Sequence, residues 1–119
     1  MAKAEEAFDM AKLSIEKHYW NSASSRLYYT CFYLVTALFA KHNIKTHTHS
    51  GVKAVFGLQF IKAGKVDAKW GQLLTNLFDT RQEGDYGDFA VLTAEDILPM
   101  LKDVEEFRVM MLKMLENWF

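Results

Sequence analysis

The sequence predicts an all-α fold: an up-and-down bundle of four to five helices that forms a single domain over residues 1–119. Three observations favour this fold class. Apolar residues recur at helical spacing through most of the chain. The stretch from Leu27 to Ala40 is apolar at almost every position and lacks Gly and Pro, which is the pattern of a buried central helix. No segment alternates apolar and polar residues as a half-buried strand would.

The first two helices are expected over residues 2–18 and 20–42. In the first, apolar side chains recur on one face and charged side chains fill the other. The second is expected to be the centre of the bundle, since at about 1.5 Å per residue it can cross a small domain. Asn21 or Ser22 can cap its start, because a short polar side chain accepts a backbone N–H there.

A third helix is expected over residues 51–63 and a fourth over residues 68–82. Ser50 can cap the third helix. Gly64 is suited to end it, because glycine readily adopts the left-handed conformation found at helix ends.

Residues 84–93 are expected to form a loop, and a long last helix follows it. Thr93 can cap that helix, with Asp96 at the third helical position in a box-like start. The apolar stripe of this helix consists of Ile97, Met100, Leu101, Val104, Phe107, Met111, Met114, Leu115 and Trp118.

Charge is distributed unevenly, although the net charge is only −1. Residues 41–69 hold six lysines against one aspartate, whereas residues 70–119 hold ten acidic side chains against four basic ones. The middle of the chain can carry a positive patch for a phosphate-bearing ligand. It can also be a solvated helix face. Because the lysines are spread out and no arginine accompanies them, the solvated face is the preferred interpretation.

The composition indicates an intracellular protein. The single cysteine, Cys31, lies in the most apolar stretch and is expected to be a buried, reduced thiol in a cytoplasmic protein. Residues 1–17 are amphipathic and contain four acids, so no signal peptide is expected. The apolar run of the central helix is too short and too rich in tyrosine to favour a membrane span. Half of the residues are hydrophobic, so we expect a thick core or an apolar face for a partner chain.

Three histidines, His42, His47 and His49, lie in or beside a polar break between the second and third helices. A zinc site needs three or four ligands, and the chain has no second Cys/His cluster, so no metal and no other cofactor is expected. We expect His49 to cap the third helix or to pin it to the central one. Cys31 is expected to pack rather than to react, because an active thiol must be exposed.

The remaining polar candidates are Arg26, Tyr29, Arg81, Asp85 and Tyr86. Arg26 and Tyr29 share a face of the central helix. Arg81 lies on the core stripe of the fourth helix, where it needs an acid or carbonyl partner, and Asp85 is close in sequence. Such a set can hold a phosphate or a ribose, or it can form a structural network that fixes the following loop. From the residues alone, the structural network is the preferred interpretation.

A set of motifs, in a fixed order along nearly the whole chain, resembles the HEPN domain family. The motifs are Arg26-Leu27-Tyr28-Tyr29, His49-Ser50-Gly51-Val52, and Arg81 followed by Asp85-Tyr86. The resemblance implies a helical bundle that pairs two-fold, in a small stand-alone protein of a bacterium or archaeon. Members of this family are often encoded beside a minimal nucleotidyltransferase, and many act in toxin–antitoxin or defence systems.

The active family members are metal-independent RNases in which an Arg and a following His act at the dimer cleft, where a ribose 2′-hydroxyl attacks the adjacent phosphodiester. Arg81 matches the arginine, but residues 85–88 contain no histidine, and Asp85 and Tyr86 stand there instead. This pattern resembles the branch of nucleotide-binding or partner proteins.

The resemblance therefore implies a homodimer that binds a nucleotide, a nucleic acid or a nucleotidyltransferase partner, as a component of a toxin–antitoxin or defence-type module. The residues expected at its cleft are Arg26, Tyr29, Arg81, Asp85 and Tyr86. The alternative is a metal-independent endoribonuclease, in which Arg81 binds the scissile phosphate and His49, Tyr86 or Asp85 carries the proton.

Overall fold

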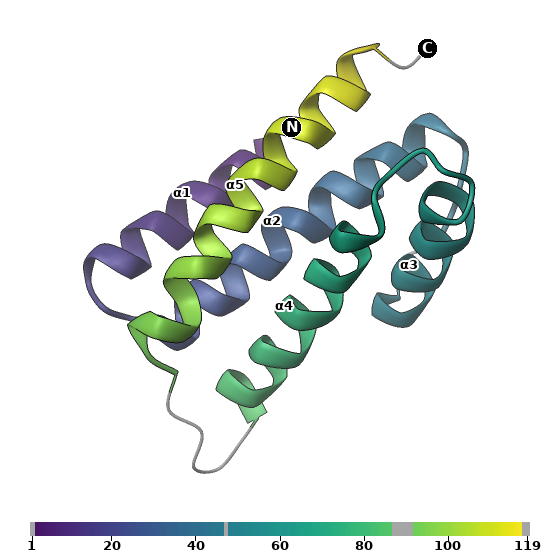
Figure 1. Ribbon diagram of the computed structural model, residues 1–119. Helices are drawn as coiled ribbons and strands as arrows, with labels where there is room; N and C mark the ends of the chain where they lie inside the picture. Colours follow the sequence, from purple (N-terminus) through teal and green to yellow (C-terminus); the bar gives the residue numbers. More distant parts are fainter. Residues whose placement is uncertain (1, 47, 87–91, 118–119) are drawn as a thin grey trace.

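The helix α2 (Trp20–Lys41) lies at the centre of the computed structural model and contacts each of the other four α-helices. Figure 1 shows α1, α2, α4 and α5 running alternately up and down, with α3 packed against α2 and α4. The structure describes residues 2–46, 48–86 and 92–117, with the side chains of 83–86 and 117 left out. The other elements are α1 (Ala2–Glu16), α3 (His49–Phe56), a π-helical turn η1 (Gly57–Ile61), α4 (Ala68–Tyr86) and α5 (Ala94–Asn117).

The prediction of an all-α bundle is confirmed, since the described residues form helices and include no strand. The expected central helix is also confirmed. Four of its apolar side chains, Leu27, Cys31, Leu34 and Leu38, are fully buried. Each buried leucine stabilises the fold by about 1.5–3 kcal/mol relative to an exposed one. Within the described chain, no helix combines the length and apolar character that crossing a membrane requires.

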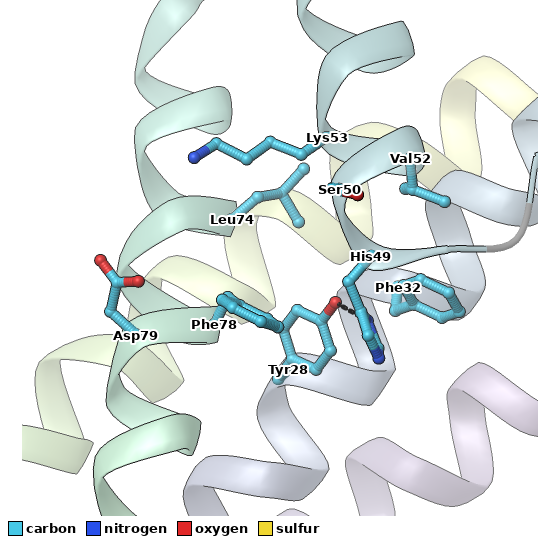
Figure 2. A pocket seen from close by; sticks show the side chains of 9 residues that line it. All are labelled: Tyr28, Phe32, His49, Ser50, Val52, Lys53, Leu74, Phe78 and Asp79. Atoms are coloured by element: carbon cyan, nitrogen blue, oxygen red, sulfur yellow. Dashed lines mark hydrogen bonds between the residues drawn. The ribbon is translucent and has the colours of Figure 1, made fainter.

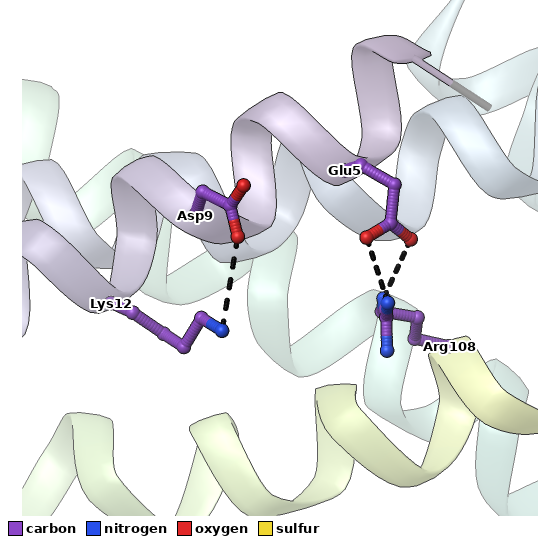
Figure 3. Close-up of polar contacts among 4 residues, drawn as sticks. All are labelled: Glu5, Asp9, Lys12 and Arg108. Atoms are coloured by element: carbon purple, nitrogen blue, oxygen red, sulfur yellow. Dashed lines mark hydrogen bonds and ion pairs between the residues drawn. The ribbon is translucent and has the colours of Figure 1, made fainter.

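The two outer helices of one side, α1 and α5, are joined by a bidentate ion pair (Figure 3). Arg108 donates from Nε and Nη2 to the two carboxylate oxygens of Glu5, at 2.8 and 2.7 Å. The guanidinium also lies over the ring of Phe8, 5.1 Å from its centroid. This arrangement ties together two helices that both pack on α2.

The predicted boundary of the fourth helix was wrong at its end. The helix α4 continues to Tyr86, so residues 84–86 are helical rather than part of a loop. Residues 87–91 lie outside the described residues. A glycine such as Gly84 costs about 1 kcal/mol within a helix. It lowers the local helix preference without ending a helix that packs along its length against a neighbour, as α4 packs against α2.

The start and the course of the third helix also differ from the prediction. Thr48 is the cap rather than Ser50, and its side chain accepts a hydrogen bond from the N–H of Gly51 at 3.0 Å. A Cβ at Gly51 would lie only 2.7 Å from the Thr48 hydroxyl oxygen, so the close approach explains the glycine of the His-Ser-Gly motif. The end was predicted correctly, because Gly64 adopts a φ of 78°.

The π-helical turn η1 was not predicted. The N–H of Lys62 reaches back five residues to the carbonyl of Gly57, at 2.9 Å. Within this turn, Phe60 is buried and stacks on both Phe56 and Phe39, with ring centroids 5.9 Å apart in each pair.

The predicted cap of α2 was wrong, and the predicted cap of α5 is confirmed. The helix α2 begins at Trp20, and its cap residue Tyr19 makes no side-chain capping bond, so the expected caps Asn21 and Ser22 lie inside the first turn. At the start of α5, the backbone N–H and the hydroxyl of Thr93 both donate to the carboxylate of Asp96, at 2.9 and 3.2 Å. This start confirms the predicted cap.

Candidate functional site

His49 joins α3 to the central helix. It is the first residue of α3, and its Nδ1 atom is hydrogen-bonded to the hydroxyl of Tyr28 on α2 (Figure 2). The expected role of His49 in pinning the third helix to the central one is therefore confirmed. The bond accommodates either tautomer of the imidazole, with the proton on Nδ1 or on Nε2.

Arg81 approaches the same part of α2 from α4. Its Nη2 atom donates to the hydroxyl of Tyr29 at 3.2 Å. The guanidinium carbon lies 5.1 Å from the centroid of the Tyr29 ring and 5.7 Å from that of Tyr28, which is within the range of cation–π attraction. Three helices thus contribute to one group of side chains, Tyr28, Tyr29, His49 and Arg81, which we call the Arg81 cluster.

The electrostatics of the Arg81 cluster keep its imidazole and phenol neutral. Burial lowers the pKa of His49, and the positive charge of Arg81 lowers this pKa further. Burial also raises the pKa of Tyr28 well above its ordinary value, although Arg81 acts in the opposite direction. At neutral pH, Tyr28 therefore keeps its proton, and the positive charge of Arg81 is felt across the cluster.

A pocket of about 220 Å³ opens beside this cluster, between α3 and α4, with α2 behind it (Figure 2). Tyr28 and His49 belong both to the cluster and to the pocket wall. Four rings, those of Tyr28, Phe32, His49 and Phe78, touch one another there, with centroids between 5.1 and 5.9 Å apart. The remaining residues that line the pocket are Ser50, Val52, Lys53, Leu74 and Asp79.

The predicted site residues are only partly brought together. Tyr29, Arg81 and His49 meet, whereas Arg26 is exposed and makes no bond or ring contact with them in the described structure. The expected pairing of Arg81 with Asp85 lies outside the described residues, because the side chains of 83–86 are not described.

His42, the other histidine of the polar break that the structure describes, does not join the cluster. His47 lies outside the described residues, and His42 faces Phe60 at the far end of α2, 5.4 Å between centroids. Among the described residues, no group of three or more His, Cys, Asp and Glu side chains is placed to hold a metal ion. Cys31 is fully buried, and burial raises the pKa of its thiol, so it packs as expected and is not an activated nucleophile.

Sequence analysis did not predict most of the pocket wall, including Tyr28, Phe32, Lys53 and Phe78. Tyr28 is only 4% exposed, but its hydroxyl reaches His49. The one available signal was the spacing of Tyr28 and Phe32, one turn apart on the same face of α2. Phe78 and Lys53 gave no such signal, because each lies on a separate helix.

Comparisons with known proteins agree with the resemblance to the HEPN domain family. A family model described as the HEPN domain matches residues 1–115. A "UPF0332 protein" of Thermotoga maritima is 34% identical over 115 residues, which cover 97% of this chain and 87% of that protein.

Two proteins of Methanocaldococcus jannaschii are also similar, and they carry the names "Putative toxin MJ0605" and "Putative toxin MJ0142". Each is 32% identical, over 70% and 71% of this chain and over 62% and 57% of their own lengths. The family match spans nearly all of the chain, including the three helices that build the Arg81 cluster. The chain therefore belongs to the HEPN domain family.

Proposed function

We propose that this protein is the nucleotide- or RNA-binding component of a toxin–antitoxin or defence-type module, and that Arg81 holds a phosphate of the ligand. The observation that carries the proposal is the convergence of Arg81, Tyr28, Tyr29 and His49 from three helices. A guanidinium offers a planar fork of donors that matches phosphate oxygens. Aromatic rings offer faces on which bases stack. The similarity to two proteins named as toxins supports the module.

The test is the affinity of the purified protein for a labelled single-stranded RNA and for ATP, measured by fluorescence anisotropy and calorimetry. Arg81→Ala should weaken binding, because the guanidinium is removed from the cluster. Lys102→Ala is the matched control, since it removes one exposed positive charge from α5, which contributes no residue to the Arg81 cluster or its pocket as described. Equal affinities of wild type and Arg81→Ala would overturn the assignment.

The proposed binding cleft includes Arg26, Asp85 and Tyr86 around the cluster. Arg26 lies one turn before Tyr29 on α2, and Asp85 and Tyr86 follow Arg81 in the last turns of α4. We expect Arg26→Ala to weaken RNA binding less than Arg81→Ala, because an exposed arginine contributes a phosphate contact that water and salt can screen.

We further propose that two copies pair and that a minimal nucleotidyltransferase is the partner of the pair in the cytoplasm. Exposed apolar side chains support an association surface: Leu13, Leu98 and Val109 are 50%, 47% and 45% exposed. Light scattering should give twice the chain mass of 13.8 kDa. A monomer over the micromolar range would remove the paired arrangement.

A second candidate function is a metal-independent endoribonuclease, and the position of His49 favours it. The imidazole is near enough to Arg81 for the guanidinium to lower its pKa. In the tautomer in which Nδ1–H donates to Tyr28, the Nε2 atom can accept the proton of a ribose 2′-hydroxyl. The 2′-oxygen then attacks the adjacent phosphorus and Arg81 stabilises the charged phosphoryl oxygens. The bond to the 5′-oxygen breaks, and this oxygen takes a proton from water, while the imidazolium of His49 returns its proton to solvent.

This reaction predicts 2′,3′-cyclic phosphate and 5′-hydroxyl ends, formed in the presence of EDTA. His49→Asn should abolish cleavage even at RNA concentrations that saturate the variant, which separates proton transfer from any loss of affinity. A broad panel of RNAs that the wild-type protein binds and leaves intact would exclude the enzyme and leave the binding function in place.

A further inference from the structure

The pocket beside the Arg81 cluster has a composition that selects a class of ligand. Four of its nine lining residues carry rings, and these come from α2, α3 and α4 (Figure 2). Its rim carries a cation on α3, Lys53, and an anion on α4, Asp79, both exposed. A purely apolar ligand would leave these two charges without a polar contact, and a lone phosphate would make no stacking contact with the rings.

The rings are already packed against one another without a ligand. His49 lies 5.1 Å from Phe32, 5.3 Å from Tyr28 and 5.5 Å from Phe78, measured between ring centroids. The Tyr28–His49 hydrogen bond fixes two of these four rings relative to each other. A preformed aromatic surface loses little conformational entropy when a flat ligand settles on it.

The size of the pocket favours a single ring system. Its volume of about 220 Å³ is below the ~300–1,000 Å³ of sites that take drug-sized molecules. Leu74 of α4 and the extended side chain of Lys53 lie on the side away from Tyr28 in Figure 2, so a planar group can lie between them and the rings. A larger substituent would have to leave through the rim.

The polar groups at the pocket match a heterocycle with ring and exocyclic nitrogens. The carboxylate of Asp79 accepts hydrogen bonds from N–H groups of such a heterocycle, and the hydroxyl of Ser50 both donates and accepts. The pocket wall and the Arg81 cluster share two residues, Tyr28 and His49. A ring in the pocket would therefore place its attached sugar phosphate within the region of positive charge from Arg81 and Lys53.

We propose that this pocket binds one unstacked nucleobase, whose phosphate is the one held by Arg81. This inference rests on the proposed nucleotide- or RNA-binding function and identifies the base as the chemical group that the pocket recognises. The base can come from a free nucleotide or from a single-stranded RNA, and both share the chemistry of a flat heterocycle joined to a phosphate.

The experiment compares ligands that differ only in the base. One arm measures the binding of AMP and of ribose 5-phosphate by calorimetry. The other arm measures a short single-stranded RNA and a series in which each position in turn is made abasic. We expect a loss of about tenfold when the base that occupies the pocket is removed. A preference for AMP indicates a free nucleotide, and a preference seen only at one position of the oligonucleotide indicates RNA.

Two variants connect the base preference to the pocket. Phe78→Leu removes one ring and keeps an apolar side chain of similar length. Ser50→Leu fills the pocket from an exposed position, so it leaves the core unchanged. Both should bind the natural and the base-less ligands equally. Ser50→Leu should also unfold at the wild-type temperature, whereas Phe78→Leu should be somewhat less stable because its ring packs on Tyr28 and His49. Arg81→Ala should instead weaken both kinds of ligand together.

The outcomes separate the two proposals. Equal binding of natural and base-less ligands by the wild-type protein would overturn the pocket assignment and leave the Arg81 phosphate site standing. A base preference that survives in both Phe78→Leu and Ser50→Leu would also overturn it. Absence of all binding to AMP and to RNA would overturn the proposed function and this inference together.

Discussion

Two arginines, Arg108 and Arg81, have different surroundings in the same bundle. Arg108 meets a carboxylate with two hydrogen bonds and lies over Phe8, so its charge is neutralised within a clamp between α1 and α5 (Figure 3). Arg81 donates to a phenol, lies over two tyrosine rings, and lowers the pKa of His49. The same side chain thus stabilises the fold at one place and supplies a positive field to a pocket wall at another.

This difference distinguishes an arginine that is paired within the fold from one whose charge acts on titratable neighbours. An arginine held in a fork by a carboxylate has its geometry and charge satisfied inside the protein. An arginine whose field acts on neutral, hydrogen-bonding aromatic residues changes how those residues titrate and what they can bind. The difference between Arg108 and Arg81 leads to expected outcomes for ligand binding, for stability and for its pH dependence.

The largest effect is expected on ligand binding. Arg81→Ala should weaken binding to single-stranded RNA by about 10–100-fold, since a charge-assisted hydrogen bond contributes ~1.5–3 kcal/mol. Arg108→Ala should leave the affinity unchanged within about twofold, because its charge is already paired with Glu5. Fluorescence anisotropy measures both variants under the same salt conditions. An equal loss in the two variants would show that only the total charge matters.

The next effect concerns the hydrogen bonds of the Arg81 cluster. Tyr28→Phe should lower the free energy of unfolding by about 1 kcal/mol, because a buried hydroxyl and its imidazole partner both lose a bond. Tyr29→Phe is the matched control. Tyr29 is only half-buried, so water can replace its hydroxyl beside Arg81, and the loss should be about half as large or less. Urea denaturation measures both, and a larger loss in Tyr29→Phe would reverse the assignment of the buried bond.

A smaller effect is expected for the ion pair of α1 and α5. A double-mutant cycle with Glu5→Gln and Arg108→Gln should give a coupling of about 0.5–1 kcal/mol, discounted because the Glu5 side chain is 39% exposed. The pair Asp9–Lys12 is the control. Its atoms are 3.8 Å apart on side chains that are 73% and 52% exposed, so its coupling should be close to zero. Coupling of equal size in the two cycles would contradict the clamp.

The smallest effect is the pH dependence of stability. Because the pKa of His49 is lowered in the fold, the unfolded chain binds more protons as pH falls through about 6.5. The free energy of unfolding should therefore decrease from pH 7.5 to 5.5, and less so in His49→Asn. The lowered pKa of Glu5 acts at lower pH, where its contribution is lost as the carboxylate becomes protonated below about 4.3. Denaturation curves at the two pH values check the difference, and parallel losses in both proteins would assign the dependence to another group.

Local sequence signals were sufficient for most of the scaffold. The uninterrupted apolar run of residues 27–40 predicted the buried central helix, since a helix that is apolar all round has no face for water. Thr93 with Asp96 and the glycine at 64 marked a helix start and a helix end, because capping depends on side chains and backbone angles within a few residues. The expected pinning of the third helix by His49 was also local, since it followed from the place of that histidine at a helix start.

Where the predictions failed, tertiary contacts had more influence than local preference. Glycines in the segment 84–87 suggested a loop, yet α4 continues through Gly84 to Tyr86 along α2. The π-helical turn over residues 57–61 has no sequence signature of its own, and its Phe60 contacts Phe39 of α2. For α4, packing against the central helix outweighs the helix-propensity cost of a glycine, about 1 kcal/mol.

Apolar periodicity and short motifs in the sequence were enough to predict the all-α class, the central helix and the family. The sequence left open whether Arg81 fixes the following loop or binds a ligand, because that depends on which side chains from other helices come near it. Only the tertiary structure placed Tyr28, Tyr29 and His49 around Arg81 and put Phe78 and Lys53 on the wall of the same pocket. The physical reason is that periodicity reports which face of each helix is buried, whereas the register between helices is set by packing across the whole core.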